Sequence, residues 1–101
     1  DINICDEDEM SSMIMAAANK RGDIVRAICL SGGDVNHQDK NGATVLHHLI
    51  AHEGEIETIT LLGERGVDVN KHDRAGWSPL SYAHYYHRSD LVDWLRARGA
   101  V

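Results

Sequence analysis

The chain has 101 residues, 43% of them apolar, with no Phe, a single Pro and a formal net charge of −6. This length allows one modest core or a short stack of repeated units, so it predicts a single domain over residues 1–101. The acidic balance works against nucleic acid as a partner, because backbone binding depends on Lys and Arg to neutralise phosphates. The longest uncharged apolar stretch, residues 13–18, is far shorter than the roughly 20 residues that cross a bilayer, and no membrane insertion is expected.

No secretory signal is visible, and Cys5 and Cys29 make a poor disulfide framework. We therefore expect an intracellular protein, cytoplasmic first and nuclear as the alternative. Both thiols are expected to be free.

An internal repeat of about 33 residues organises the sequence. Asp1-Ile2-Asn3 returns as Asp34-Val35-Asn36 and again as Asp68-Val69-Asn70, at spacings of 33 and then 34. The first repeat has six acidic and three basic residues, the second six and two, and the third four and five. The formal charges of the three repeats are therefore −3, −4 and +1. The predicted repeats are approximately 1–33, 34–67 and 68–101.

The first repeat is the least regular. An acidic run, DEDE at residues 6–9, occupies the position of a linking loop, and Glu7 and Asp8 are candidate contacts for a partner. Met10 stands where the later repeats have Gly. Terminal repeats are often atypical because they have a neighbour on one side only.

The second repeat predicts a loop followed by two helices. The Thr44 hydroxyl can accept a hydrogen bond from an orphaned backbone N–H, so Thr44 is the expected N-cap of a helix that carries Leu46. Gly54 interrupts the pattern, and apolar residues return at helical spacing over 56–62. Gly66 then ends the second helix as a left-handed cap.

The third repeat predicts the same elements. Ser78 is the expected N-cap and Pro79 the first helical residue. Ser89 interrupts the pattern, residues 91–95 carry the second apolar face, and Gly99 ends that helix.

The second and third repeats resemble the ankyrin repeat, whose pattern is D-x-x-G-x-T-P-L-H-x-A, a Gly, an apolar helix and G-A-D-V-N. The matching residues are Asp39, Gly42, Thr44, Leu46, His47, Gly54, Gly66 and 68–70 in one copy, and Asp73, Gly76, Ser78, Pro79, Leu80, Ala83, Gly99 and Ala100 in the next. The resemblance implies an all-α ankyrin-repeat solenoid of helix pairs, stacked side by side and joined by β-hairpin loops.

The resemblance also assigns structural roles. His47 takes the place of the family His, whose ring points at the loop backbone and ties adjacent repeats together. An imidazole suits this role because it has one donor and one acceptor. The residues with an implied structural role are Gly42, Thr44, Leu46, His47, Gly76, Ser78, Pro79 and Leu80.

Extra residues before the inter-helix Gly or Ser predict longer first helices or looser turns between the helices. The chain begins at a repeat boundary without Met and stops where another Asp-Val-Asn is due. We therefore expect it to be a piece of a longer protein with further repeats or another domain.

Seven His residues raise the question of a metal site. His48 and His52 are spaced i, i+4 on one helical face, which suits zinc, but two ligands are not a site. A second pair, His84 and His87, is spaced i, i+3, and we find no carboxylate or Cys at ligand spacing near either pair. We expect no metal and no cofactor.

Catalysis is not expected either. Ser81 and His84 share a helix, but a nucleophile needs a base that a third group orients. A stack of thin repeats offers no oxyanion loop and no deep pocket.

The family's groove is formed by loop tips and first helices, and here it would run from acidic to basic. Trp77 is the foremost candidate, because the family tolerates almost any residue there and binding hot spots are rich in Trp, Tyr and Arg. The predicted contact cluster is Trp77, Arg74, Tyr86 and Arg88. The other candidate contacts are Lys40, Asn41, His52, Lys71, His72 and His87, with Glu7 and Asp8.

We therefore predict a non-catalytic protein-interaction module that binds a protein or peptide segment of mixed charge and acts as an adaptor or targeting scaffold. The sequence sets no oligomeric state, and a monomer is the expectation. The alternative is a regulatory domain that docks on a catalytic domain of its own polypeptide. A metal-dependent or enzymatic unit is the remote alternative.

Overall fold

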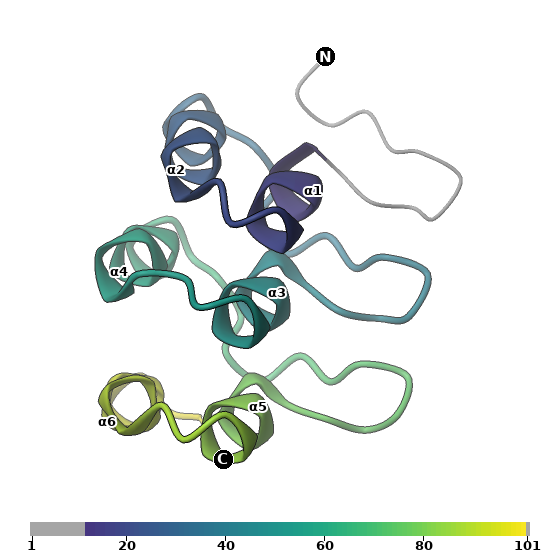
Figure 1. Cartoon of the computed structure of the whole chain (residues 1–101), viewed down its shortest axis with the longest axis vertical. Coiled ribbons are helices and arrows are strands. Elements are labelled where there is room, and N and C mark those ends of the chain that lie inside the picture. Colours follow the sequence, from purple (N-terminus) through teal and green to yellow (C-terminus); the bar gives the residue numbers. More distant parts are fainter. Residues whose placement is uncertain (1–11, 101) are drawn as a thin grey trace.

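The computed structural model describes residues 12–100, and six helices are present in that range. They form two columns, with the first helix of each repeat in one column and the second helix in the other (Figure 1). The first helices are α1 (Ser12–Ala18), α3 (Val45–Ala51) and α5 (Pro79–Tyr85). The second helices are α2 (Gly22–Leu30), α4 (Ile56–Glu64) and α6 (Ser89–Ala97).

Loops between repeats project away from the second helices, on the outer side of the first column (Figure 1). Each turns back on itself as a hairpin does, with the Asp39 N–H donating to the Ala43 carbonyl at 2.9 Å in one loop and the Asp73 N–H to the Trp77 carbonyl at 3.0 Å in the next. No strand is assigned anywhere in residues 12–100. The expected hairpin loops are therefore hairpin-shaped turns without a β ladder.

The predicted caps start the helices. Thr44 accepts a hydrogen bond from the backbone N–H of His47, and Ser78 accepts one from Ser81, while Pro79 occupies the first turn of α5. Helices of seven and nine residues are too short to be stable alone. They persist because their apolar faces pack together.

The core runs through the middle of the stack, between the two columns. Its largest fully buried apolar side chains are Met13, Ile14, Val25, Val45, Leu46, Leu49, Ile50, Ile59, Leu62, Leu91 and Leu95. Leu80 and Ala83 carry the same core into α5. Cys29 is a buried thiol in α2, and it is free, as predicted. Trp94 packs against this core with the Arg98 guanidinium 4.9 Å from its ring centre.

The turns between paired helices correct one expectation, the break at Ser89, and decide between the two alternatives for the extra residues. Ser89 lies inside α6, so the turn ends at Arg88. Helices α3 and α5 have seven residues each, so the extra residues do not lengthen them. They lie in the turns 52–55 and 86–88, which favours the looser turn of the two alternatives. None of the helices in residues 12–100 has the length and apolar character that a membrane span requires.

Candidate functional site

Two aspartates fix the shape of the loops. The Oδ1 atom of Asp39 accepts hydrogen bonds from the backbone N–H groups of Asn41 and Ala43, at 2.9 and 3.0 Å. The Oδ1 atom of Asp73 accepts from Ala75 and Trp77, at 3.0 and 2.9 Å. Short polar side chains that bond to the backbone two residues ahead are typical turn formers. Each loop therefore presents the second oxygen of its aspartate toward the neighbouring first helix.

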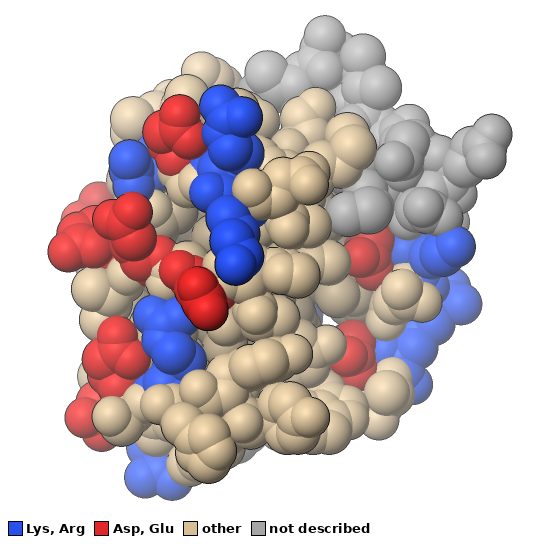
Figure 2. All heavy atoms as spheres, in the orientation of Figure 1, with Lys and Arg blue, Asp and Glu red and all other residues tan. Residues whose placement is uncertain are grey.

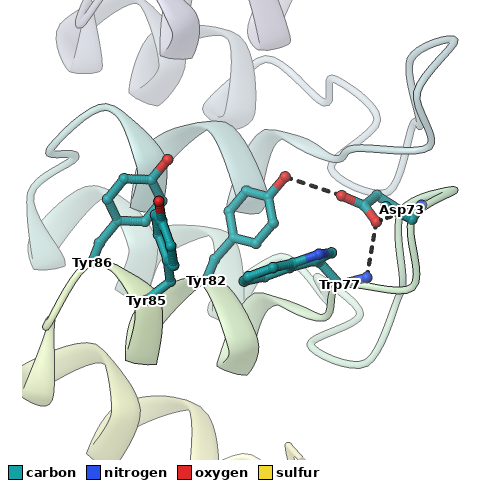
Figure 3. A pocket seen from close by; sticks show the side chains of 6 residues that line it. Asp73, Trp77, Tyr82, Tyr85 and Tyr86 are labelled. Carbon is teal, nitrogen blue, oxygen red and sulfur yellow. Dashed lines mark hydrogen bonds between the residues drawn. The ribbon is translucent and has the colours of Figure 1, made fainter.

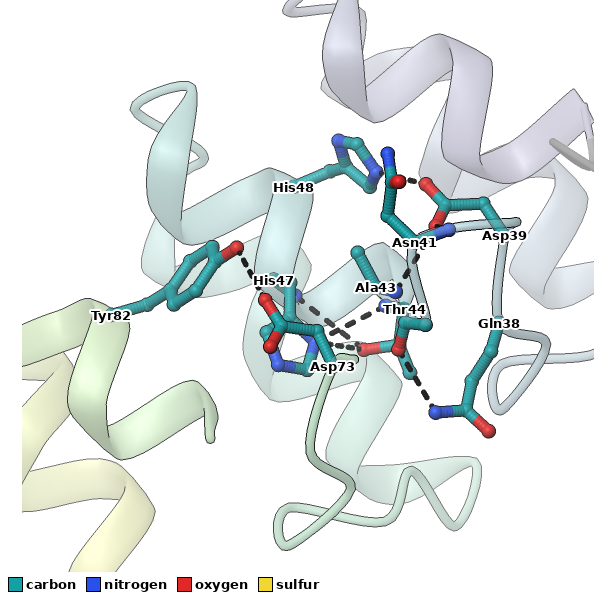
Figure 4. Close-up of polar contacts among 10 residues, drawn as sticks. Gln38, Asp39, Asn41, Ala43, Thr44, His47, His48, Asp73 and Tyr82 are labelled. Atoms are coloured by element: carbon teal, nitrogen blue, oxygen red, sulfur yellow. Dashed lines mark hydrogen bonds and ion pairs between the residues drawn. The ribbon is translucent and has the colours of Figure 1, made fainter. Parts of the chain in front are cut away.

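That second oxygen meets a different side chain in each repeat. The Oδ2 atom of Asp39 lies 2.9 Å from Nε2 of His48, nine residues later (Figure 4). The Oδ2 atom of Asp73 accepts a hydrogen bond from the Tyr82 hydroxyl at 3.0 Å, again nine residues later. Burial, followed by this hydrogen bond, raises the pKa of Tyr82 to about 12. Tyr82 is therefore a neutral donor where the preceding repeat has an imidazole.

His47 connects the second repeat to the third. Its ring is fully buried, and Nδ1 accepts a hydrogen bond from the Thr44 N–H at 3.1 Å. Nε2 therefore carries the proton and donates to the Trp77 carbonyl at 2.9 Å. Burial lowers the pKa of His47, against the opposing effect of the hydrogen bond to Trp77. This arrangement confirms the inter-repeat role that the resemblance implied.

The two loops also bind each other directly. The Arg74 N–H donates to the Asn41 carbonyl at 2.9 Å, and the Gln38 side-chain amide donates to the His72 carbonyl of the next loop at 3.2 Å, as well as to the Gly42 carbonyl of its own loop at 2.9 Å. Gly42 has φ of 77°, and a Cβ atom there would lie 2.8 Å from the backbone nitrogen of Arg74. Glycine at this position is what allows the loops to approach.

An aromatic cluster lies where the third loop joins α5. We use this name for Trp77, Tyr82, Tyr85 and Tyr86. Ring centres are 5.8 Å apart for Trp77 and Tyr82, 5.6 Å for Trp77 and Tyr85, and 5.0 Å for Tyr85 and Tyr86. The rings surround a shallow hollow of about 290 Å³ that Asp73 and Ala75 also line (Figure 3). Tyr85 is 64% exposed, Tyr86 43% and Trp77 39%, so the cluster is open to solvent.

The structure divides the predicted contact cluster. Trp77 and Tyr86 share the aromatic hollow, whereas Arg74 lines a separate hollow between the loops, together with His72. The Arg88 guanidinium donates to the Gly54 carbonyl at 2.9 Å and thereby ties the inter-helix turns of the second and third repeats together. Its role as a partner contact stays a prediction.

The remaining candidates are spread over the surface. His52 lines a small hollow with Lys20 and Glu53, between the first and second repeats, and burial lowers its pKa. His87 is exposed in the last inter-helix turn, away from the aromatic hollow. Lys40, Asn41 and Lys71 lie in the loops. Glu7 and Asp8 lie outside the described residues.

Charge is unevenly distributed over the described surface. Lys and Arg side chains gather at the outer ends of the loops, to the right in Figure 2, where the loops carry Lys40, Lys71 and Arg74. Acidic side chains are frequent on the opposite side, over the second helices, where Lys and Arg side chains lie among them. Only the outer ends of the loops are therefore locally basic in the part described.

The expectation that no carboxylate lies near the pair His48 and His52 was wrong. A carboxylate does stand beside the first pair, because Asp39 contacts His48, whose ring also stacks on His52 with centres 5.9 Å apart. A loop and a helix bring these groups together across nine residues, which spacing on the helix alone does not reveal. Within residues 12–100, no three His, Cys, Asp or Glu side chains are placed to hold a metal ion.

Tyr82 and Tyr85 were missed as site residues. The available signal was their position, because all Trp and Tyr residues of the chain fall between positions 77 and 94. In a chain without Phe, such a concentration in one repeat indicates a local aromatic surface.

A family model described as ankyrin repeats, in three copies, matches residues 12–101. The chain is 36% identical over 70 residues to a potassium channel, AKT1, of Oryza sativa subsp. indica, covering 69% of this chain and 7% of the channel. It is 34% identical over 89 residues to serine/threonine-protein kinase 12 of Arabidopsis thaliana, covering 86% of this chain and 19% of the kinase.

A third relative is calmodulin-binding transcription activator 6 of Arabidopsis thaliana, which is 34% identical over 71 residues, or 70% of this chain and 8% of the relative. The chain therefore corresponds to a small part of each of these longer proteins.

Proposed function

Because the chain belongs to the ankyrin repeat family, whose repeats are protein-interaction modules and are typically not catalytic, we propose that it binds a segment of a partner protein. The binding surface is the groove face, defined as loops 34–43 and 68–77 with the exposed side of α3 and α5. On this proposal the chain acts as an adaptor or targeting scaffold.

The observation that supports this face is the aromatic cluster. Large exposed aromatic side chains are costly on a surface that contacts only water, and Trp and Tyr are enriched at the centres of protein interfaces. Trp77 and Tyr85 gather around one hollow, and they are held there by the Asp73 loop and by α5. Leu30, by comparison, is an isolated exposed residue of α2, 58% exposed.

The basic loop ends add a second source of recognition. Lys71 and Arg74 lie in the loop that carries Trp77, and Lys40 lies in the preceding loop. Such charges speed association and select partners more than they add affinity. A segment with acidic residues alongside an anchor for the aromatic hollow suits this face.

The test begins with selection of binders from a library of displayed random peptides. The affinity of an enriched peptide is then measured by calorimetry for the original chain and for Trp77→Ala, Tyr85→Ala and Leu30→Ala. We expect the two groove variants to weaken binding by about tenfold or more, since hot-spot truncations cost about 2 kcal/mol or more. Leu30→Ala is the matched control and should bind normally. Equal affinity for all four proteins would contradict the proposal.

A second candidate is suggested by the relatives. The chain matches only 19% of a protein kinase and 7% of a potassium channel, so its counterparts are parts of larger polypeptides. On this alternative the groove face docks on a catalytic domain of its own polypeptide and regulates it. The same peptide would then bind the isolated chain more tightly than the full-length protein, because the groove is already covered there.

A further inference from the structure

Resting on the proposed function, we propose that the aromatic hollow holds the cationic head group of an Arg or Lys side chain of the bound segment. The juxtaposition that carries this inference is an aspartate carboxylate with no basic partner, set among the rings of Trp77, Tyr82 and Tyr85. The inference specifies which type of residue in the partner segment anchors it, a detail that the proposed groove face alone does not give.

The charge of Asp73 is the first step. In the second repeat, the equivalent Asp39 has an imidazole, His48, within 2.9 Å. In the third repeat a tyrosine, Tyr82, takes that place, and its hydroxyl donates a hydrogen bond without bringing a charge. No basic side chain in the described part of the chain forms an ion pair with Asp73. With Tyr in place of His, no imidazole faces Oδ2 of Asp73, and the carboxylate lies at the hollow.

The hydrogen bonds of Asp73 leave room for one more donor. A carboxylate has about four lone-pair sites. Oδ1 accepts from two backbone N–H groups, and Oδ2 accepts from Tyr82. One site on Oδ2 remains for an N–H of a guanidinium or ammonium group.

The rings supply the second step. The planes of Tyr82 and Tyr85 stand at 77° and 90° to the Trp77 plane, so the indole forms a floor from which the two phenol rings rise (Figure 3). The negative face of an aromatic ring attracts a cation, and Trp does so most strongly. Several faces at steep angles around one hollow present this attraction from more than one direction.

Size and access also fit. The hollow of about 290 Å³ is too small for a folded element but accommodates a side-chain end, and Tyr85 and Trp77 border it while remaining exposed. The nearest basic residue in sequence, Arg74, does not fill it, because Arg74 lines the hollow between the loops. On this proposal the cation comes from the bound segment.

The basic loop ends define the rest of the segment. Lys71 and Arg74 lie in the same loop as Asp73, so a segment made only of basic residues would be repelled there. The inferred ligand is one cationic residue seated in the hollow, with acidic residues beside it.

The probes are blocked single amino acids, titrated into the isotope-labelled chain and followed by nuclear magnetic resonance. The cationic probes are the N-acetyl amides of arginine, lysine and trimethyl-lysine, and the neutral counterparts are those of citrulline and norleucine. We expect the cations to shift the indole N–H signal of Trp77, while that of Trp94 stays in place as an internal reference. A larger shift with arginine assigns a guanidinium, and one with a lysine probe assigns an ammonium. Equal shifts with citrulline or norleucine, or none with any cation, would overturn the inference.

Two variants test the contribution of the Asp73 carboxylate and of the tyrosine that faces it. Asp73→Asn keeps an oxygen for the backbone N–H groups but removes the charge, and Tyr82→His copies the pairing of the second repeat. Both should reduce affinity for the cationic probes by about three- to tenfold, the size of a cation–π or exposed charge contact. Glu57→Gln removes one exposed charge on α4 and is the control. Unchanged affinity in a folded Asp73→Asn would contradict the role of the carboxylate.

The outcome distinguishes this inference from the proposed function. If an enriched peptide loses affinity with Trp77→Ala but is indifferent to Asp73→Asn and to replacement of its Arg or Lys by citrulline or norleucine, the groove binds segments and the cationic anchor is wrong. If Trp77→Ala has no effect on that peptide, the groove proposal itself fails.

Discussion

The Nε2 atom of His47 lies 2.9 Å from the carbonyl oxygen of Trp77, a residue of the following repeat. The backbone of Trp77 is therefore held at two groups: its carbonyl accepts from His47, and its N–H donates to the Asp73 carboxylate. Ser81 stands at the equivalent position of the third repeat, and its hydroxyl lies 3.1 Å from that of Ser78. His47 thus bonds to the following repeat, whereas Ser81 at the equivalent position contacts only the N-cap residue of its own helix.

Replacing His47 by Ala should destabilise the fold by about 1 to 3 kcal/mol, because it leaves the buried Thr44 N–H without its acceptor and removes one of the two donors to the partly buried Trp77 carbonyl. Urea unfolding followed by circular dichroism measures the change. His84→Ala is the control, since His84 is exposed on α5. A loss no larger than that of His84→Ala would mean that the inter-repeat hydrogen bond contributes little.

Stability should fall on mild acidification. Burial lowers the pKa of His47 from its ordinary value of 6.5, so below that pH the unfolded chain takes up a proton more readily than the folded one. The stability linked to this group is complete above about pH 6.5 and declines as the pH falls toward the lower pKa of the folded state. His52 is shifted in the same direction.

Melting temperatures measured between about pH 7.5 and 5 test this linkage. The variant His47→Ala should show a shallower decline than the original chain, because one of the two groups no longer titrates. Parallel declines in both proteins would assign the acid sensitivity to other groups.

Gly42→Ala should cost more stability than Gly76→Ala. Both glycines have left-handed backbone angles, with φ of 77° and 87°, so both substitutions carry a strain of about 1 to 2 kcal/mol. A Cβ at position 42 also meets the backbone of Arg74 at 2.8 Å, whereas nothing lies within 4 Å at position 76. The difference between the two free energies of unfolding isolates the contact between loops. Equal losses would show that the loops move apart at little cost.

Glycine should stabilise the inter-helix turns. Lys20, Glu53 and His87 have φ of 60°, 63° and 56°, angles that cost a side-chain-bearing residue about 1 kcal/mol. His87→Gly is therefore expected to raise the melting temperature, whereas His84→Gly, inside α5, should lower it because glycine is a poor helix former. A destabilised His87→Gly would indicate that the imidazole makes contacts that offset the strain.

Much of the fold could be predicted because its signals are local. Thr44 and Ser78 cap their helices through backbone groups a few residues away, and Gly66 and Gly99 have the left-handed angles that close a helix, with φ of 85° and 91°. Such features depend on short stretches of chain and leave a readable pattern. The turn boundary at Ser89 was misplaced because Arg88 and Ser89 are equally polar, and no cap side chain marks the start of α6.

The candidate site was predicted less well, for a physical reason. Trp77 and Tyr86 were found because they are exposed residues of a type enriched in interfaces. Tyr82 was missed because its importance comes from Asp73, which a loop returns to within 3.0 Å. The hydrogen bond of Arg88 was not predicted because its acceptor, the Gly54 carbonyl, is 34 residues away in the chain.

The sequence by itself determined the repeat, its helix caps and its closing glycines, since each follows from the conformational preferences of a few neighbouring residues. Only the tertiary structure decided which side chain faces each loop aspartate. Asp39 and Asp73 occupy the same position in successive repeats, yet one faces an imidazole and the other a phenol. The contact between a loop aspartate and a side chain of the following helix depends on their distance in space, and that distance is set only when the helices stack.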